Sequence, residues 1–243
     1  DTDHKSLFSG TVMALALELK TGTKRSHTAA ENTKFVGSFL RGVVSEENYR
    51  TLIKDFYFVY SAIEEEMERL KDDEFLNPIY FKELNRLNSL KMDLRYYYGP
   101  NWMMEIKPSE ACIQYVERIH EVADKDPYLL VGHHYTRYLG DLSGGQILKG
   151  IAEKALNLPK NEGLHFYDFP DITDKKEFKT KYRSGLDKVT TDSHKINDII
   201  AEANYAFRLN MYMFDELSGS TKDAINSAAK VFIQTFVGAF KKG

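Results

Sequence analysis

The sequence has little cysteine and no apolar run long enough to span a membrane. Cys112 is the only cysteine among 243 residues, so no disulfide forms within the chain and no metal or haem site rests on two thiols. A reducing compartment fits this composition. The apolar stretch 231–240 lies between two lysines and is shorter than the roughly 20 residues of a membrane helix. The chain starts at Asp1 without a methionine, so a targeting peptide would lie outside it. We therefore expect a soluble protein.

The sequence also lacks a strong charge of one sign and the common catalytic signatures. Its net charge is −3, from 33 basic and 36 acidic side chains, which gives no global signal for nucleic acid or membrane binding. It contains no phosphate-binding glycine loop, no nucleophile elbow and no HExxH motif. These signatures of nucleotide, acyl and peptide hydrolysis are therefore absent. Tyrosine and phenylalanine, at 15 each, supply aromatic core or pocket walls.

Helical periodicity dominates what is present, and no segment alternates as a strand would. Capping signals at Ser45, Ser109, Asp174 and Thr191 mark helix starts. The acidic triplet 64–66 is predicted to be a solvated helix face. We predict an all-α single domain at 11–218, a flexible N-terminus at 1–10 and a C-terminal tail at 219–243 that is a short helix or partly disordered. The predicted helices cover about 12–31, 35–41, 45–71, 89–98, 109–124, 127–157, 174–186 and 191–217.

Three glycines lie within six positions of the stretch 135–146, inside the helix predicted at 127–157. Each glycine in a helix interior costs roughly 1 kcal/mol against alanine. Gly140 and Gly144 are four residues apart, so they share a helix face and leave a bare strip of backbone. Such a strip suits a broad, planar, rigid ligand, and it equally suits close packing of a second helix. The glycines alone leave both interpretations open.

A histidine is surrounded by charge on the helix predicted at 12–31. Lys20, Thr23, Lys24 and Glu31 lie at −7, −4, −3 and +4 from His27, so they share its face. Glu31 can accept from one imidazole nitrogen and fix the tautomer. A cation-flanked imidazole near a carboxylate is typical of an axial metal ligand with anionic groups nearby. A solvated basic face with an incidental histidine gives the same pattern.

The other histidines suggest weaker metal sites. His133 and His134 are adjacent and diverge by roughly 100° on a helix, so they cannot hold one ion together; we expect one to pack in the core or reach a polar partner. A di-iron site needs two Glu-x-x-His pairs on facing helices. The pair at 117–120 lies on a predicted helix, but the pair at 162–165 falls in a loop rich in proline and glycine.

Three motifs together closely resemble the haem oxygenases: the His27 face, the stretch 135–146 and the late segment Ala206-Phe207-Arg208-Leu209-Asn210. The resemblance runs from about residue 15 to 217 and includes 64–66, 97–99 and 179–183. It implies an all-α fold in which haem lies between a proximal helix bearing His27 and a bent distal helix bearing Gly140 and Gly144.

The resemblance also implies a role for individual residues. His27 would ligate the iron and Glu31 would tune it. Asp141 would not touch the iron but would order distal water that supplies protons. Arg137, Gly140 and Gly144 would be the other catalytic positions. The propionates would be held by Lys20, Lys179, Arg183 and Tyr135. Further pocket positions would be Thr23, Thr136, Ser143, Gly145, Phe207, Asn210 and Phe214.

The implied reaction uses haem b as cofactor and substrate. Cleavage at the α-meso carbon with O2 would give biliverdin IXα, carbon monoxide and ferrous iron. The sequence shows no flavin or nicotinamide site, so electrons would come from a donor protein docked on basic patches. The segment 80–86 looks closer to cyanobacterial and algal members, which favours ferredoxin over a flavoprotein reductase and a role in bilin synthesis. We expect a monomer or weak dimer in a plastid stroma or cyanobacterial cytoplasm. The rival hypotheses are a haem carrier or sensor on the same fold and a cofactor-free or di-iron helical enzyme.

Overall fold

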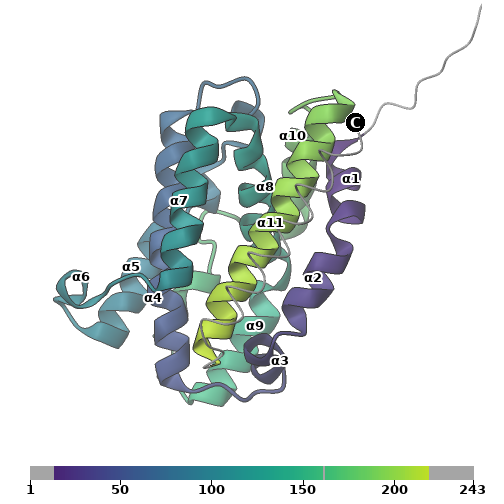
Figure 1. Ribbon diagram of the computed structural model, residues 1–243. Coiled ribbons are helices and arrows are strands. Elements are labelled where there is room, and N and C mark those ends of the chain that lie inside the picture. Colours follow the sequence, from purple (N-terminus) through teal and green to yellow (C-terminus); the bar gives the residue numbers. More distant parts are fainter. Residues whose placement is uncertain (1–13, 161, 219–243) are drawn as a thin grey trace, which may run out of the picture.

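The computed structural model describes residues 14–160 and 162–218, and these form helices, turns and loops without a β-strand (Figure 1). The predicted all-α class is therefore confirmed. The predicted segments 1–10 and 219–243 lie outside the described residues. The α-helices are α1 (Leu15–Gly22), α2 (Lys24–Glu31), α3 (Lys34–Leu40), α4 (Glu46–Arg69), α5 (Leu87–Tyr98), α6 (Trp102–Glu105), α7 (Glu110–Lys125), α8 (Leu130–His134), α9 (Gly140–Leu156), α10 (Lys175–Leu186) and α11 (Ser193–Leu217).

The long helix α11 organises the bundle. It contacts α1, α2, α3, α4, α7 and α8, and Figure 1 shows it running diagonally with α4 and α7 on one side and α1 and α2 on the other. Short 3₁₀ turns at Asn77–Ile79, Lys82–Leu84, Pro127–Leu129 and His165–Tyr167 join the helices. None of the described helices is both long and apolar enough to cross a bilayer.

Three of the four predicted helix caps are confirmed, at Ser45, Ser109 and Asp174. The Ser45 hydroxyl accepts from the Asn48 amide at 3.1 Å, and the Asp174 carboxylate accepts from two amides of the first turn of α10. The cap predicted at Thr191 is wrong by one residue. Asp192 caps α11 instead, accepting from the His194 amide at 2.8 Å, because its carboxylate is the stronger acceptor at this end of the helix.

The helix predicted at 12–31 is broken in two. Thr23 separates α1 from α2 with φ −103° and ψ 0°, and its hydroxyl donates to the Leu19 carbonyl at 2.7 Å. Threonine side chains compete in this way with the backbone ladder and disturb a helix. Residues 12 and 13 of the predicted helix lie outside the described part of the chain.

The glycine-bearing segment follows one helical path from Pro127 to Leu156, but it is not regular. A π-helical turn, Tyr135–Leu139, joins α8 to α9 directly before Gly140. The Thr136 hydroxyl donates to the Gly132 carbonyl at 2.8 Å within this turn. Such single π turns often occur at functional sites.

The prediction that the acidic triplet 64–66 is a solvated helix face is wrong, because only Glu65 is exposed. Glu64 is buried and accepts from the Arg86 amide and the Tyr138 hydroxyl. Glu66 is also buried and pairs with a neighbouring arginine and histidine. Buried carboxylates persist where hydrogen-bond donors from other elements satisfy them.

Candidate functional site

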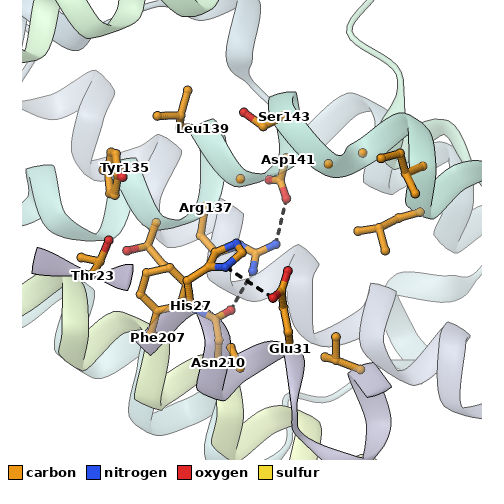
Figure 2. Close-up of a pocket in the computed structure, with 18 of the residues that line it drawn as sticks. Thr23, His27, Glu31, Tyr135, Arg137, Leu139, Asp141, Ser143, Phe207 and Asn210 are labelled. Atoms are coloured by element: carbon orange, nitrogen blue, oxygen red, sulfur yellow. Dashed lines mark hydrogen bonds and ion pairs between the residues drawn. The ribbon is translucent and has the colours of Figure 1, made fainter. Parts of the chain in front are cut away.

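A cavity of about 800 Å³ opens between α2, the π turn with α9, and α11 (Figure 2). Apolar side chains such as Phe35, Phe56 and Phe166 supply much of its wall. All but one of the predicted site residues line it: Lys20, Thr23, His27, Glu31, Tyr135, Thr136, Arg137, Gly140, Asp141, Ser143, Gly144, Gly145, Arg183, Phe207, Asn210 and Phe214.

The imidazole of His27 lies on the α2 wall, with 58% of its side chain exposed. Its Nδ1 lies 3.7 Å from the Glu31 carboxylate, a charge-pair distance that is longer than a hydrogen bond. Its ring meets Phe207 of α11 edge to face, with the ring centroids 5.9 Å apart. No hydrogen bond from Nε2 is found to any described residue, so this nitrogen is available to a ligand.

The bare backbone lies on the facing wall. A Cβ added at Gly140 or Gly144 would have no atom within 4 Å beyond its own neighbourhood in the chain and helix, so both positions border open space. Gly145 differs, because a Cβ there would lie 3.6 Å from the Tyr167 ring. At Gly140 and Gly144 the structure therefore supports the interpretation of the strip as open space for a ligand. At Gly145 it supports close packing, against Tyr167.

Asp141 belongs to a buried polar network. Its carboxylate pairs with Arg137 Nη2 at 3.0 Å and accepts from the Tyr60 hydroxyl. Arg137 also donates to the Tyr60 oxygen at 2.9 Å and to Asn210 Oδ1 at 2.8 Å (Figure 2 draws the contacts with Asp141 and Asn210). Burial raises the pKa of Asp141, and the Arg137 charge opposes that rise. The network fixes a carboxylate beside the cavity.

Tyr60, on α4, is not among the site residues predicted from the sequence, although it completes this network. The residue is fully buried. Its hydroxyl nevertheless contacts both charged groups of the network. Helical periodicity shows that a side chain faces inward but does not show which polar groups lie there.

One edge of the cavity is basic. Lys20, Lys24 and Arg183 line it, and Tyr135 lies among them. Burial raises the pKa of Tyr135, while its hydrogen-bonding contact with the Thr23 side chain and the Arg183 charge lower it. Lys179 is the predicted residue that the cavity does not include. It precedes Arg183 by four residues of α10, or about 6 Å along the axis.

The adjacent histidines, His133 and His134, each lie within hydrogen-bond distance of another buried side chain. His133 Nε2 lies 2.7 Å from the Glu202 carboxylate, and His134 Nδ1 lies 2.7 Å from the Tyr182 hydroxyl. Both are buried, and burial lowers the pKa of His134 to about 3. The expectation that one of them packs in the core or reaches a polar partner is confirmed for both.

The two Glu-x-x-His motifs do not meet. The histidine of the first pairs with Glu66 and that of the second with Asp93. Within residues 14–160 and 162–218, no three His, Cys, Asp or Glu side chains are grouped so that they could hold a metal ion. The structure thus gives the di-iron hypothesis no support.

The cavity therefore combines one available imidazole, a bare backbone wall opposite, a fixed carboxylate and a basic edge. These features fit a broad, flat, mainly apolar group that carries acidic substituents on one side and a metal with room for one nitrogen ligand. A group held in this way would lie within reach of the Asp141 network.

Comparisons with known proteins agree with this chemistry. Residues 13–216 match the family described as "Heme oxygenase". The chain is 56% identical over 209 residues to the heme oxygenase of Porphyra purpurea, covering 86% of this chain and 89% of that protein. It is 53% identical over 211 residues to heme oxygenase 1 of Synechocystis, covering 87% and 88%. The crystal structure of cyanobacterial heme oxygenase-1 in complex with heme superposes with a TM-score of 0.83 at 50% identity, over 92% of this chain and all of that one. With the motifs, the cavity and these relatives in agreement, the chain belongs to the haem oxygenase family.

Proposed function

We propose that the chain binds haem b in the α2–α9 cavity and cleaves it at the α-meso carbon, using O2, to biliverdin IXα, carbon monoxide and ferrous iron. The observation that carries this proposal is that His27 and the Asp141 network line one cavity from facing elements. A carrier would need the histidine but not a fixed carboxylate on the opposite wall. The reaction consumes its own cofactor, so haem is cofactor and substrate together.

The donor set of the cavity fits haem. His27 would hold the iron, which supplies the oxygen-activating chemistry, and Glu31 would adjust the charge on the imidazole. Lys20, Tyr135 and Arg183 would hold the propionates at the basic edge. The related cyanobacterial protein was crystallised in complex with heme, which supports the same use of this cavity.

The bare wall would set how haem lies. With no side chain at Gly140 or Gly144, a flat ring can approach the backbone of α9 more closely than a Cβ permits. A propionate grip at one edge then decides which ring edge faces this wall. This is the basis for proposing the α-meso outcome.

Asp141 would act through water. Arg137 and Tyr60 fix its carboxylate, and Asn210 fixes Arg137 in turn. A carboxylate held in this way could order a water molecule beside the cavity and supply it with a proton, without itself contacting the metal. The remaining wall around the ring would be formed by other residues that line the cavity: Thr136, Ser143, Gly145, Phe207 and Phe214.

The electrons would come from ferredoxin. Lys20, Lys24 and Arg183 are exposed at the cavity edge, and Lys179 lies on the same face of α10 as Arg183. A basic surface at a redox site steers an acidic donor toward it. Relatives in red algae and cyanobacteria support this donor, a plastid or cyanobacterial location and a role in supplying bilin pigments.

The test is to load the protein with haem, add ferredoxin, its reductase and NADPH, and follow the Soret band and the product. The proposal expects loss of the band and a bilin identified as the IXα isomer. Bound haem that survives under these conditions and also with a flavoprotein reductase would make the chain a carrier or sensor. Turnover only with the flavoprotein reductase would overturn the choice of donor.

A further inference from the structure

The junction between α1 and α2 is pressed directly against α11. Gly22 is the last residue of α1, and a Cβ at this position would lie 2.6 Å from Ile200 Cγ2. A larger residue here would force the Ile200 side chain or the junction to shift, since real Cβ atoms essentially never come this near another heavy atom. The chain therefore enters α2, the helix of His27, from a point held against α11.

A single amide ties this junction to α11. Asn204 Nδ2 donates to the Gly22 carbonyl at 3.1 Å and to the Ile200 carbonyl at 3.0 Å. Its Oδ1 accepts from the Ser26 hydroxyl at 2.5 Å. The carbonyl at the end of α1 belongs to a group that lacks partners within its own helix, and Asn204 supplies one. One side chain thus holds the last residue of α1 and the first turn of α2.

Ser26 directly precedes His27, and the next contact along α11 is with His27 itself. Phe207 lies one turn beyond Asn204 and meets the imidazole edge to face. Positions 200, 204 and 207 follow helical spacing, so they form one stripe of α11 along the proximal helix. This stripe contacts Gly22, just before the break at Thr23, and also Ser26 and His27.

We propose that Asn204 is a positioning residue: through Ser26 it fixes the start of α2 and so the place and direction of the His27 imidazole. The inference rests on the proposed role of His27 as the haem ligand. A break such as that at Thr23 permits α2 to pivot, and the amide opposes the pivot. Groups that orient a metal ligand without touching the metal change metal affinity by about 10-fold or more when removed.

The test uses Asn204→Ala and Ser26→Ala in the full chain. Asn197→Ala is the matched control, because it removes an exposed amide from the same helix. In the haem-free protein, amide hydrogen exchange over 22–28 should be faster in both variants and unchanged in the control. In the loaded protein, haem transfer to a scavenging apoprotein should be about 10-fold faster, with a shifted iron–histidine stretching frequency.

In the double variant, the effects of the two substitutions on haem transfer should not add, since each substitution breaks the same Ser26–Asn204 contact. Parental haem transfer and an unshifted stretching frequency in Asn204→Ala would overturn the inference, even if its melting temperature falls. If Asn204→Ala fails to fold, Ser26→Ala decides, because it removes only one hydroxyl. A His27→Ala variant with an unchanged haem spectrum would instead overturn the proposed function, so the two failures are distinguishable.

Discussion

Arg137 and Asp141 pair at 3.0 Å across one turn of the distal helix, with Arg137 in the π turn and Asp141 in the first turn of α9. Each group also has a second hydrogen-bond partner: Arg137 donates to Asn210, and Asp141 accepts from Tyr60. The pair is nearly shielded from solvent, with 11% and 9% of the side chains exposed. The Asp141 carboxylate is therefore held from two sides, by Arg137 and by Tyr60.

Replacing Asp141 tests whether this carboxylate serves catalysis. We expect Asp141→Ala to bind haem, because His27 and the basic edge remain, but to form biliverdin about 100-fold more slowly, the usual order of a lost proton-transfer group. Haem titration by absorbance and a single-turnover assay measure the two properties separately.

Asp141→Asn is the control for packing, since it keeps an oxygen that can accept from Tyr60. Its melting temperature should stay closer to the parent than that of Asp141→Ala, which leaves Arg137 with one partner fewer. Biliverdin formation at the parent rate in the alanine variant would remove Asp141 from the mechanism.

Replacing His27 tests the proposed metal ligand. We expect His27→Ala to lose the nitrogen-ligated haem spectrum, because no other side chain that lines the cavity within residues 14–160 and 162–218 is a histidine. Added imidazole should restore the spectrum by filling the space left by the ring. His194→Ala is the matched control, since His194 is exposed at the start of α11 and does not line the cavity. A parental spectrum in His27→Ala would move the ligand elsewhere.

Helix positions could be predicted from the sequence because their signals are local. The caps at Ser45 and Asp174 join residues two or three positions apart. The burial of Glu64 could not be predicted in this way, because its donors come from Arg86 and Tyr138, 22 and 74 positions away. A helical wheel shows which residues share a face, whereas the neighbour of that face depends on the tertiary fold.

The same distinction holds at the site. The His27 face and the strip of Gly140 and Gly144 follow from helical spacing, and the structure places both on the cavity wall. To predict the role of Tyr60 one must know where α4 meets the distal helix, because its partner Asp141 lies 81 positions away in sequence. The exclusion of Lys179 likewise depends on where α10 passes the cavity edge, which spacing from Arg183 alone does not give.

Replacing Gly144, which borders open space, should change folding stability and haem affinity in opposite directions. Gly144→Ala should raise the free energy of unfolding of the haem-free protein by up to about 1 kcal/mol, because alanine favours the helix and meets no atom within 4 Å. The same methyl group projects where haem is proposed to approach the backbone, so haem affinity should fall. Chemical denaturation and haem titration measure these two effects.

Gly150→Ala is the matched control for the glycine variant. Gly150 lies on α9 and also borders open space, but it does not line the cavity. It should gain similar stability and keep the parental haem affinity. Equal haem affinity in both variants would mean that Gly144 does not form the haem contact.

Glu64 predicts how stability depends on pH. Burial raises the pKa of Glu64 to about 7, from an ordinary value of 4.5, although the Arg86 amide and the Tyr138 hydroxyl oppose the rise. Between these two values the folded chain holds a proton that the unfolded chain releases. By linkage, the contribution of this group is complete below pH 4.5 and is lost as the pH rises toward 7. Its full size is about 3 kcal/mol.

Glu64→Gln removes this titration and keeps an oxygen for both donors. The free energy of unfolding, measured by denaturant titration at half-unit steps from pH 5 to pH 8, should therefore fall less with rising pH in the variant than in the parent. His134 works in the opposite direction, because its pKa is lowered to about 3 by burial, but it is common to both proteins and cancels in their difference. Glu65→Gln, at the exposed neighbour, is the matched control for removing one carboxyl group from α4. If the free energy of unfolding of Glu64→Gln falls with pH as steeply as that of the parent, Glu64 does not hold the extra proton and its carboxylate stays ionised between its two donors.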